Sequence, residues 1–326
     1  MPTRSEIARI DARTETVMQV RSYSLRTSET YRRWIRLFLE ANPDRPVDAL
    51  GRADVERYLE RLTNRDGIAP KTRNQATSAL AFLFREVLGR DELRGMPRAR
   101  EPRRLPIVLS HGRARLVLGQ LSGKYRLLAA LMYGSGLRLM EAHRLRVKDI
   151  DFDLLQIAVM DGKGAKSRWT LLPERLVRGL RRQIDQVRIQ HQADRGDGGG
   201  WAALPHALAR KDPRAGYQLG WQYVFPASRE RLDPATGRRG RHHLSPSATQ
   251  RQVKQAGRAS GVPKPVSCHT FRRSFATQML RAGYDVRSVQ KLMGHRDVRT
   301  TMIYVQAVTD TGIGMRSPLD LSARID

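Results

Sequence analysis

The 326-residue sequence has little cysteine and few aromatic side chains: one Cys, at position 268, and 6% Phe, Trp and Tyr. A single cysteine excludes an intramolecular disulfide and is typical of a reducing compartment, so we expect a cytoplasmic, nucleoid-associated protein. No apolar run approaches the roughly 18 residues of a membrane-spanning helix. The first residues also lack the apolar core of a signal peptide, and we expect no membrane partner.

Acidic residues are scarce relative to basic ones. Sixty Lys and Arg stand against 32 Asp and Glu, which leaves a net charge of +28. Most of the excess is arginine, whose planar guanidinium matches phosphate oxygens better than the point charge of lysine does. Such an excess repels itself unless a polyanion binds, and nucleic acid is the obvious polyanion. A basic membrane-surface protein competes with this interpretation, but no strongly basic amphipathic helix flanked by aromatics is present.

Helical periodicity dominates the first hundred residues. Apolar residues recur at helical spacing near residues 31–39, 55–62 and 76–87, and Thr27 or Ser28 would cap the first of these helices. The prolines and arginines of residues 98–109 predict a solvated linker. We therefore expect a helical domain over residues 1–97, a basic linker over 98–109 and a second domain over 110–326.

Arginines interleave with the apolar positions of the N-terminal helices. Arg32, Arg36 and Arg73 fall on the polar faces and are candidates to grip DNA phosphates. The alternative is an ordinary solvated face, which is the usual place of charged side chains on a helix.

The second domain mixes helices with one small β element. Two short β-rich runs flank a Gly-Lys-Gly turn at residues 162–164, which is typical of a hairpin. A buried helix precedes the hairpin, and helical patterning resumes after it and again from about residue 246. The stretch between is rich in loops, with a short apolar helix at most. The expected fold class is mainly α with a small β-hairpin or sheet, in two domains.

The residue pattern gives no sign of metal-dependent or ATP-dependent chemistry. Two-metal hydrolysis needs clustered carboxylates, and ATP use through a P-loop needs GxxxxGK[ST]; neither is visible. We expect no metal and no cofactor. What remains for a basic protein that cuts DNA is a nucleophile that attacks the phosphodiester while guanidinium groups hold the developing charge.

Six residues fit this chemistry. One histidine and one arginine are spaced i, i+3 on a helical face, and another arginine follows a glycine that permits a tight turn. A second histidine follows Met-Gly, a tyrosine lies nine residues later on a helix, and a lysine sits in the hairpin turn. In chain order the six candidates are Arg138, Lys163, His269, Arg272, His295 and Tyr304.

These residues stand in the motifs GLRxxE, GKG, HxxR and GH and in a final tyrosine, and in this order they resemble the active site of the tyrosine recombinases of the phage-integrase type. The resemblance covers nearly the whole chain. It implies a two-domain clamp, in which a helical core-binding domain precedes a catalytic domain, and a tetramer assembled on DNA. It also implies strand cleavage and rejoining through a 3′-phosphotyrosyl intermediate.

The resemblance gives each of the six a role as a hypothesis. Tyr304 is the nucleophile, and Lys163 protonates the leaving 5′ oxygen with His269 as a supporting acid or base. The remaining three hold the non-bridging oxygens. Each residue also has a structural alternative: Tyr304 as a packing residue, Arg138 as a partner of Glu141, the histidines as core or capping residues, and the lysine as an ordinary turn residue.

An extra segment at about residues 192–226 resembles the addition that marks integron integrases, which recombine gene-cassette sites folded from one DNA strand. The resemblance implies that Trp221, Pro234, His242 and His243 hold a protruding base by stacking, at about 1–3 kcal/mol per base. The alternative is that the aromatic residues from Trp221 to Phe225 form a buried strand. The expected partners are duplex DNA and folded single-stranded sites.

Other functions remain open. A chromosome-dimer-resolving or phage-type recombinase would act on duplex sites only, and a type IB topoisomerase would share the chemistry without joining two partners. A non-catalytic DNA-binding protein and a generic RNA-binding protein are compatible with the charge, but neither needs the six motif residues in order.

Overall fold

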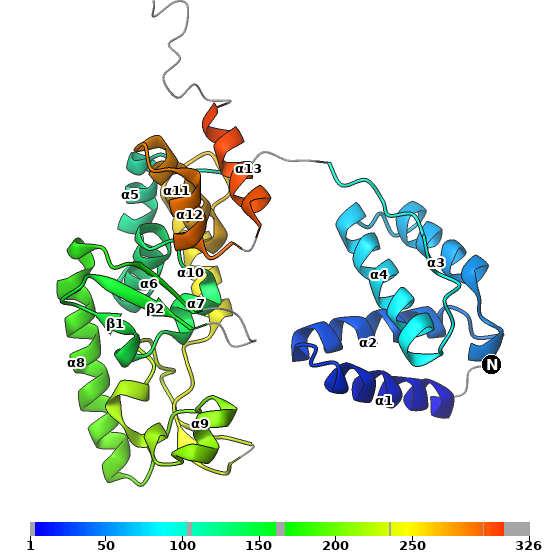
Figure 1. The fold of residues 1–326 in the computed structure, drawn as a ribbon, viewed down its shortest axis with the longest axis horizontal. Coiled ribbons are helices and arrows are strands. Elements are labelled where there is room, and N and C mark those ends of the chain that lie inside the picture. The colour runs from blue at the N-terminus through cyan, green and yellow to red at the C-terminus, as the bar shows by residue number, and fades with distance from the viewer. Residues whose placement is uncertain (1–3, 103–105, 161–166, 235, 296, 310–326) are drawn as a thin grey trace, which may run out of the picture. The chain divides into compact units, whose positions relative to one another are not determined.

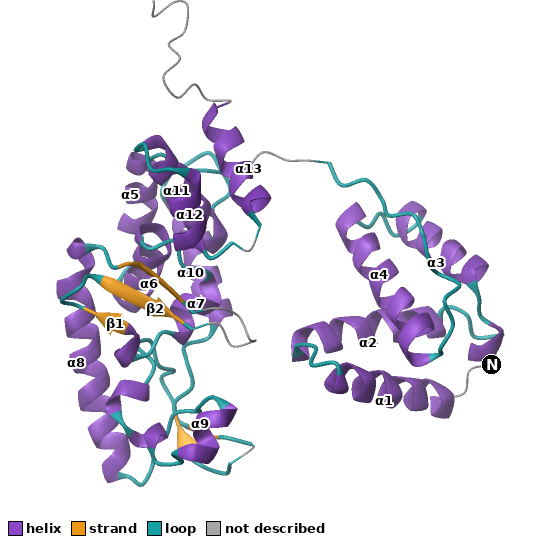
Figure 2. Cartoon of the chain, viewed as in Figure 1, coloured by secondary structure: helices purple, strands orange, loops and turns teal. Residues whose placement is uncertain are grey.

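The computed structural model describes residues 4–102, 106–160, 167–234, 236–295 and 297–309. Its internal contacts divide the chain into two compact units, Met1–Arg104 and Leu105–Asp326 (Figure 1). The described residues are mostly helical, with short strands confined to the second unit (Figure 2). The prediction of a mainly helical, two-domain fold with a small sheet is therefore confirmed.

The N-terminal unit is a small helical bundle around one apolar core. Its elements are α1 (Arg4–Val20), α2 (Leu25–Glu40), the 3-10 turn η1 (Val47–Ala49), α3 (Arg52–Asn64), α4 (Pro70–Phe82) and the π-helical turn η2 (Leu83–Val87). Phe38 and Leu39 of α2, Leu59 of α3 and Leu80 of α4 are fully buried in this core. The three helices predicted from periodicity are present because their apolar stripes meet here.

Two details of this unit differ from the prediction. The cap of α2 is Ser24, whose hydroxyl accepts a hydrogen bond from the Thr27 amide at 3.2 Å, and neither Thr27 nor Ser28. The residues directly after Ser24 are good enough helix formers to extend the helix back to it. Helix α1 was not predicted, because its buried stripe, Ile10, Thr14 and Met18, contains a polar residue.

Part of the predicted linker is held against the N-terminal unit. The side chain of Asn74 on α4 accepts from the Ala99 amide at 2.8 Å and donates to the Ala99 carbonyl at 2.9 Å. At Ala99 the linker backbone is therefore hydrogen-bonded to protein, and the linker is not solvated along its whole length as predicted. The boundary between the two units falls at residue 104.

The second unit is larger and carries the sheet. Its elements are α5 (His111–Gly119), α6 (Gly123–Gly134), α7 (Leu139–Arg144), η3 (Val147–Asp149), β1 (Ile150–Asp151), β2 (Gln156–Val159), β3 (Arg168–Leu171), α8 (Glu174–Gly196), α9 (His206–Lys211), η4 (Ala215–Tyr217), η5 (Leu219–Trp221), β4 (Arg231–Leu232), β5 (Arg239–Gly240), α10 (Pro246–Ala259), α11 (Cys268–Arg281), α12 (Val286–Met293) and α13 (Val298–Thr309).

Strands β1, β2 and β3 form an antiparallel sheet in that order, and β2 and β3 are the two arms of the predicted hairpin. Helix α11 lies among α6, α10, α12 and α13, and its residues are buried on most sides. Helix α6 is buried as predicted, with Leu128, Leu131 and Met132 wholly inside the core. This packing fixes α11 beside the carboxyl end of α12.

An ion pair with α8 anchors the loop-rich stretch that follows this helix. Arg241 forms a two-pronged pair with Asp194 of α8, at 2.6 and 2.7 Å, and both side chains are nearly buried. Trp221 closes the 3-10 turn η5, and between Gln222 and Phe225 the only β pairing is an isolated bridge from Tyr223 to Arg146. The alternative of a buried strand from Trp221 to Phe225 is therefore wrong, although Tyr223 and Phe225 are buried.

Candidate active site

Helix α11 brings two of the predicted residues into one place. Ser267 caps the helix by accepting from the Thr270 amide at 3.3 Å. His269 lies in the first turn, where it is exposed, and Arg272 lies one turn later with only 1% of its surface exposed. The i, i+3 spacing therefore gives one solvent-facing imidazole and one buried guanidinium on the same helix.

Arg272 is held by main-chain oxygens. Its guanidinium donates to the carbonyl of Gly136, and to the carbonyl of Met293 at 2.5 Å. The carboxylate of Glu141 lies 3.5 Å away. Burial, together with the nearby positive charge of Arg138, lowers the pKa of Arg272 to about 10, and Glu141 opposes this shift. The group is still charged at neutral pH, and its position is fixed before any substrate arrives.

Arg138 reaches the same place from the turn before α7. Gly136 has a φ of +63°, and a Cβ at this position would lie 2.4 Å from the ring of Phe275, so only glycine fits. Arg138 then occupies the N-cap position of α7 and donates to Glu141 at 2.6 Å and to the Gly294 carbonyl at 3.3 Å. The pairing with Glu141 is thus real, but 41% of the Arg138 side chain remains exposed.

The carboxyl end of α12 is surrounded by guanidinium groups. Three consecutive carbonyls, those of Leu292, Met293 and Gly294, accept from Arg168 at 2.9 Å, from Arg272 at 2.5 Å and from Arg138 at 3.3 Å, respectively. The last carbonyls of a helix lack partners within the helix and carry its partial negative charge, which attracts cations. His295 follows directly after this cap.

Glu141 is the counter-charge for the arginines. It accepts two hydrogen bonds from Arg168, at 3.0 and 2.7 Å, and one from the Arg138 amide at 2.8 Å. Burial alone would raise the pKa of Glu141, but the bonds and charges of Arg168 and the nearby positive groups outweigh burial and lower the pKa to about 2. The carboxylate is therefore ionised throughout the physiological range.

Sequence reasoning missed Arg168 as part of this group. On β3, Arg168 and Thr170 face inward while Trp169 and Leu171 are exposed. The usual rule places the apolar residues of a half-buried strand inside, and that rule points Arg168 outward. The signal that could have revealed it is the alternation along the strand, which puts Arg168 on the same face as Thr170 and opposite to Trp169 and Leu171.

His295 and Tyr304 lie together next to Arg272. The two rings stack with centroids 6.1 Å apart and an angle of 21° between their planes. Nδ1 of His295 contacts the Thr301 hydroxyl at 2.9 Å, and Nε2 contacts Arg272 at 3.2 Å. A guanidinium can only donate, so Nε2 is the acceptor and the ring is neutral with its proton on Nδ1. Burial first, and then Arg272 and Arg138, lower the pKa of His295 to about 4.

Tyr304 belongs to a satellite apolar cluster formed by α11, α12 and α13. It is 5% exposed and packs with Phe275, Val289 and Met293. The structural alternative, a packing residue, therefore describes its surroundings, while the stack on His295 places the same ring at the edge of the arginine group. The two interpretations are compatible.

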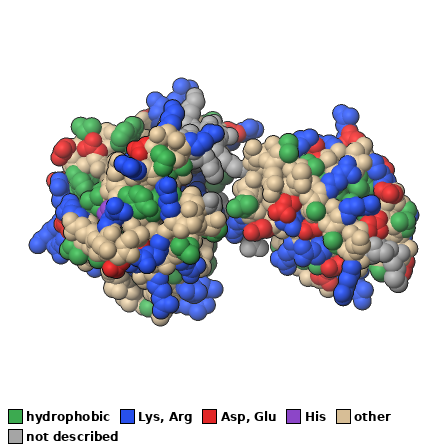
Figure 3. All heavy atoms as spheres, turned by 90° about the horizontal axis from the view of Figure 1, so that it is seen from below, with side chains coloured by type: hydrophobic (Ala, Val, Ile, Leu, Met, Phe, Trp, Pro, Cys, Tyr) green, Lys and Arg blue, Asp and Glu red, His purple; other side chains and the backbone are tan. Residues whose placement is uncertain are grey.

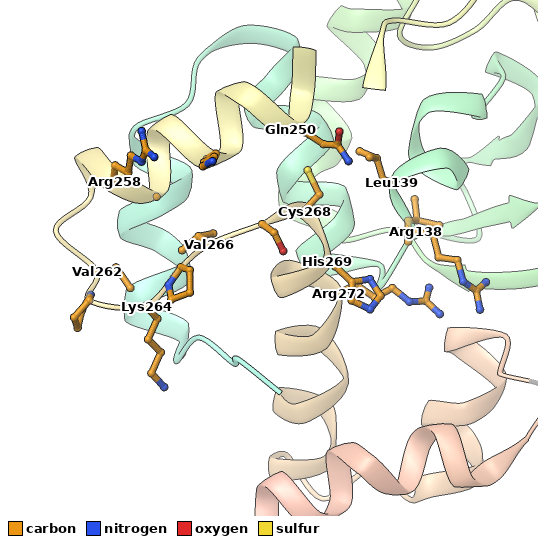
Figure 4. Close-up of a pocket in the computed structure, with 16 residues that line it drawn as sticks. Arg138, Leu139, Gln250, Arg258, Val262, Lys264, Val266, Cys268, His269 and Arg272 are labelled. Atoms are coloured by element: carbon orange, nitrogen blue, oxygen red, sulfur yellow. The ribbon is translucent and has the colours of Figure 1, made fainter. Parts of the chain in front are cut away.

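A groove opens beside these residues. It has a volume of about 870 Å³ and is lined by Arg138, His269 and Arg272 at one end and by Lys254 and Arg258 of α10 along its side. Figure 4 shows His269 and Arg272 lying close to Arg138 on this groove. Partial burial, then the charges of Arg273 and Arg272, lower the pKa of His269, which keeps it neutral at pH 7. Lys163 lies outside the described residues.

The residues predicted to stack a base fall into two places. Pro234, His242 and His243 line a pocket of about 820 Å³. The ring centroids of the two histidines lie 4.0 Å apart. Trp221 is not among the residues that line this pocket, and the cations of Arg146 and Lys148 lie 5.2 and 4.4 Å from its ring.

The predicted arginines of the N-terminal unit are already engaged to different degrees. Arg32 pairs with Asp11, and with Glu15 at 2.9 Å, whereas Arg36 is half exposed and lies 3.7 Å from Asp11. Arg73 donates to the Pro97 carbonyl at 3.5 Å. Figure 3 shows Lys and Arg side chains scattered over both units, among acidic, apolar and other surface groups. Contact of these three arginines with DNA stays a prediction.

Two features are absent from the described residues. No group of three or more His, Cys, Asp or Glu side chains in this part of the chain is arranged to hold a metal ion. None of its helices combines the length and the apolar character needed to cross a membrane.

Comparison with known proteins gives consistent matches. A model of the phage integrase family matches residues 116–310, and a model of the phage integrase N-terminal SAM-like domain matches residues 12–92. An integrase/recombinase of Escherichia coli is 44% identical over 300 residues, covering 91% of this chain and 89% of the relative. A putative integrase/recombinase of Sinorhizobium fredii, y4qK, is 32% identical over 310 residues, covering 94% and 87%.

Solved structures agree in fold. The Tn1549 transposon integrase in complex with a circular intermediate DNA aligns with a TM-score of 0.64 at 17% identity, covering 93% of this chain and 99% of that one. A lambda integrase dimer bound to a core site aligns with a TM-score of 0.62 at 15% identity, covering 90% and 96%. The family matches, the relative at 44% identity and the shared fold together establish that this chain belongs to the phage integrase family and is a tyrosine recombinase.

Proposed function

We propose that this recombinase cleaves and rejoins DNA by forming a 3′-phosphotyrosyl bond at Tyr304. The observation that carries the proposal is the convergence of Arg138, Arg272 and His295 beside the Tyr304 ring. Two guanidiniums and an imidazole can bind the two non-bridging oxygens of one phosphate, and the opening at Arg138 and His269 gives DNA access to them.

The chemistry follows from these charges. A free phenol has a pKa of about 10 and is a poor nucleophile at pH 7. Bound between Arg138 and Arg272, the phosphate has its charge offset, which favours both attack by the phenol oxygen and the five-coordinate transition state. As the new P–O bond forms, the bond to the 5′ oxygen breaks. Lys163 then supplies the proton that the 5′ oxygen needs, and His269, as the supporting acid or base, takes the proton that the phenol loses.

His295 must change its hydrogen bonding when substrate binds. Its Nε2 accepts from Arg272 in the free protein, so it cannot donate to a phosphate in that state. An anion bound beside the ring raises the pKa of a histidine and draws its second proton into place. The ring then becomes a donor to the phosphate while Nδ1 keeps Thr301 as its partner.

The test is a single-turnover cleavage assay on a duplex site with a nick that traps the covalent product. Tyr304→Phe keeps the aromatic ring and the packing of α13, so DNA binding persists but no SDS-stable adduct forms. Tyr284→Phe is the matched control, because Tyr284 is 55% exposed and lies outside the arginine group; it cleaves at the wild-type rate. An adduct that persists in the Tyr304→Phe variant would falsify the proposal.

We further propose that the substrates include gene-cassette sites of integrons, both duplex and folded from a single strand. Supporting this is the pocket of about 820 Å³ where exposed His242 lies against buried His243 beside Pro234. A base that protrudes from a hairpin has two free faces, and one of them can stack on the His242 ring. Trp221 takes a base only if Lys148 or Arg146 leaves its ring, which makes the histidine pair the stronger candidate.

The substrate proposal is tested by comparing two DNA forms of one site. His242→Ala reduces recombination of the folded strand and leaves a fully paired duplex site unaffected, while His111→Ala, another exposed histidine, changes neither. Equal loss on both DNA forms contradicts base stacking. Recombination of two marked duplex sites but never of a folded strand favours a duplex-only recombinase. Relaxation of supercoils without strand exchange favours the topoisomerase alternative.

Recombination at a junction needs four active sites, so we propose a tetramer on DNA. The mass of the complex on a synthetic four-way junction tests it. Four chains per junction support the assembly, and one or two chains per junction at saturating protein exclude it.

A further inference from the structure

We propose that Arg168 is a positioning residue of this active site, one that fixes the carboxyl end of α12, and with it His295, relative to Arg138 and Arg272. The inference rests on the proposed function, because it assumes that these three residues bind the reacting phosphate. Arg168 itself is not among the residues that line the groove. Its effect on the reaction therefore passes through its neighbours.

Among the described residues, Arg168 forms hydrogen bonds with Glu141 and with Leu292. Its guanidinium donates to both oxygens of Glu141, at 3.0 and 2.7 Å, and its Nε donates to the Leu292 carbonyl at 2.9 Å. Only 10% of the side chain is exposed. The planar fork of an arginine suits this task, since one rigid group bridges a carboxylate on one element and a carbonyl on another.

Both partners of Arg168, Glu141 and Leu292, lie next to residues that we propose bind the phosphate. Glu141 pairs with Arg138 at 2.6 Å and lies 3.5 Å from Arg272. Leu292 begins the run of three carbonyls that the three arginines share, and that run ends one residue before His295. Of these three arginines, Arg138 and Arg272 line the groove and Arg168 does not.

Gly294 gives a second, independent contact with the same side chain. It has a φ of +62°, and a Cβ there would lie 2.8 Å from Cδ of Arg168 and 2.9 Å from its Nε. The Arg168 side chain therefore packs directly against the turn between α12 and His295. Loss of this side chain removes both the hydrogen bond and the packing that hold the turn.

Arg168 could instead act through Lys163, because β3 comes shortly after this lysine in the sequence. The two routes differ chemically. A DNA site with sulfur in place of the bridging 5′ oxygen releases a thiolate, which needs no proton donor because thiols are far more acidic than alcohols. Such a substrate corrects a defect in protonation by Lys163 and leaves a defect in phosphate binding uncorrected.

The experiment uses the full chain with Arg168→Gln, Arg168→Lys and, as a matched control, Arg188→Gln, whose arginine is half exposed and pairs with Asp185 on α8. We measure DNA affinity and the single-turnover rate of adduct formation with oxygen and sulfur substrates. Arg168→Gln binds DNA normally but cleaves roughly 100-fold more slowly, the size expected for a misplacement of about 1 Å. Arg168→Lys, which keeps the charge and folds with Glu141 paired, stays impaired, and sulfur rescues neither. Arg188→Gln behaves like wild type.

Three results overturn the inference: a wild-type rate in Arg168→Gln, full recovery in Arg168→Lys, or rescue of either variant by the sulfur substrate. The last would assign Arg168 to the lysine turn. Tyr304→Phe in the same assay separates this inference from the proposed function. An adduct in that variant removes the proposed function, whereas normal cleavage by Arg168→Gln removes only the role of Arg168.

Discussion

Replacing Glu141 by Gln tests the electrostatic logic of the site most sharply. The carboxylate sits among Arg138, Arg168 and Arg272, and its pKa falls from an ordinary value of 4.5 to about 2. Each tenfold shift corresponds to about 1.4 kcal/mol, so these neighbours favour the ionised form by roughly 3 kcal/mol. Because the folded-state pKa is depressed, this stability is present above pH 4.5 and is lost as the pH falls through 2. Removing one partner of a buried charge pair carries a similar cost, about 3–5 kcal/mol.

We therefore expect Glu141→Gln to lower the free energy of unfolding by roughly 3 kcal/mol at pH 7, about 6–12 °C in melting temperature for a unit of this size. Circular dichroism on heating gives the measurement, with Glu174→Gln as a control at an exposed carboxylate. Sulfate can replace the lost negative charge between the guanidiniums, so it stabilises Glu141→Gln more than wild type or the control at equal ionic strength. A variant as stable as wild type, with no added response to sulfate, would refute the reasoning.

Three further outcomes follow from other parts of the structure. Burial, then the neighbouring histidines and an arginine, lower the pKa of His243 to about 4, below the unfolded value of 6.5. The contribution of His243 to the free energy of unfolding is therefore complete above pH 6.5 and falls by roughly 2 kcal/mol between pH 7 and pH 5. In urea unfolding, His243→Asn removes this pH dependence, and an unchanged pH dependence would assign it to another group. Gly294→Ala places a Cβ in a left-handed turn against Arg168 and costs about 1–2 kcal/mol in the same assay, with a slower cleavage rate; wild-type values for both contradict the packing described. Asp194→Asn leaves Arg241 without its nearly buried partner, so limited proteolysis cuts the stretch after α8 sooner; an unchanged rate means that other contacts hold this stretch.

The sequence alone predicts the elements whose signals are local. The apolar stripes of α2, α3 and α4 and the uniformly apolar α6 are visible in the order of residues, and so is the hairpin of β2 and β3. Polar residues that interrupt such patterns, above all Arg272 inside an apolar helix, are visible for the same reason. Five of the six motif residues can be placed. Arg138 and Arg272 meet at the last carbonyls of α12 and at Glu141. His269 lines the same groove as these arginines, and His295, stacked on Tyr304, contacts Arg272.

What could not be predicted depends on contacts between distant residues. Arg168 meets Glu141 across 27 positions and Leu292 across 124, and no periodicity reports such a meeting. Arg241 and Asp194 likewise pair across 47 positions and hold a stretch that reads as loop. Helix α1 was not predicted because its buried stripe includes the polar residue Thr14, whose hydroxyl donates to the Ile10 carbonyl at 2.7 Å. In each case a hydrogen-bond partner that only the folded structure reveals allows a polar side chain to be buried.

The most direct test of the central claim is to identify the amino acid that carries DNA after cleavage. Wild-type protein is trapped on a nicked duplex site, digested with nuclease and protease, and the nucleotide-bearing peptide is sequenced by mass spectrometry. The account predicts a single modified residue, Tyr304, linked through its phenol oxygen to a 3′ phosphate. A modified residue elsewhere in the chain, or a 5′ linkage, would contradict it.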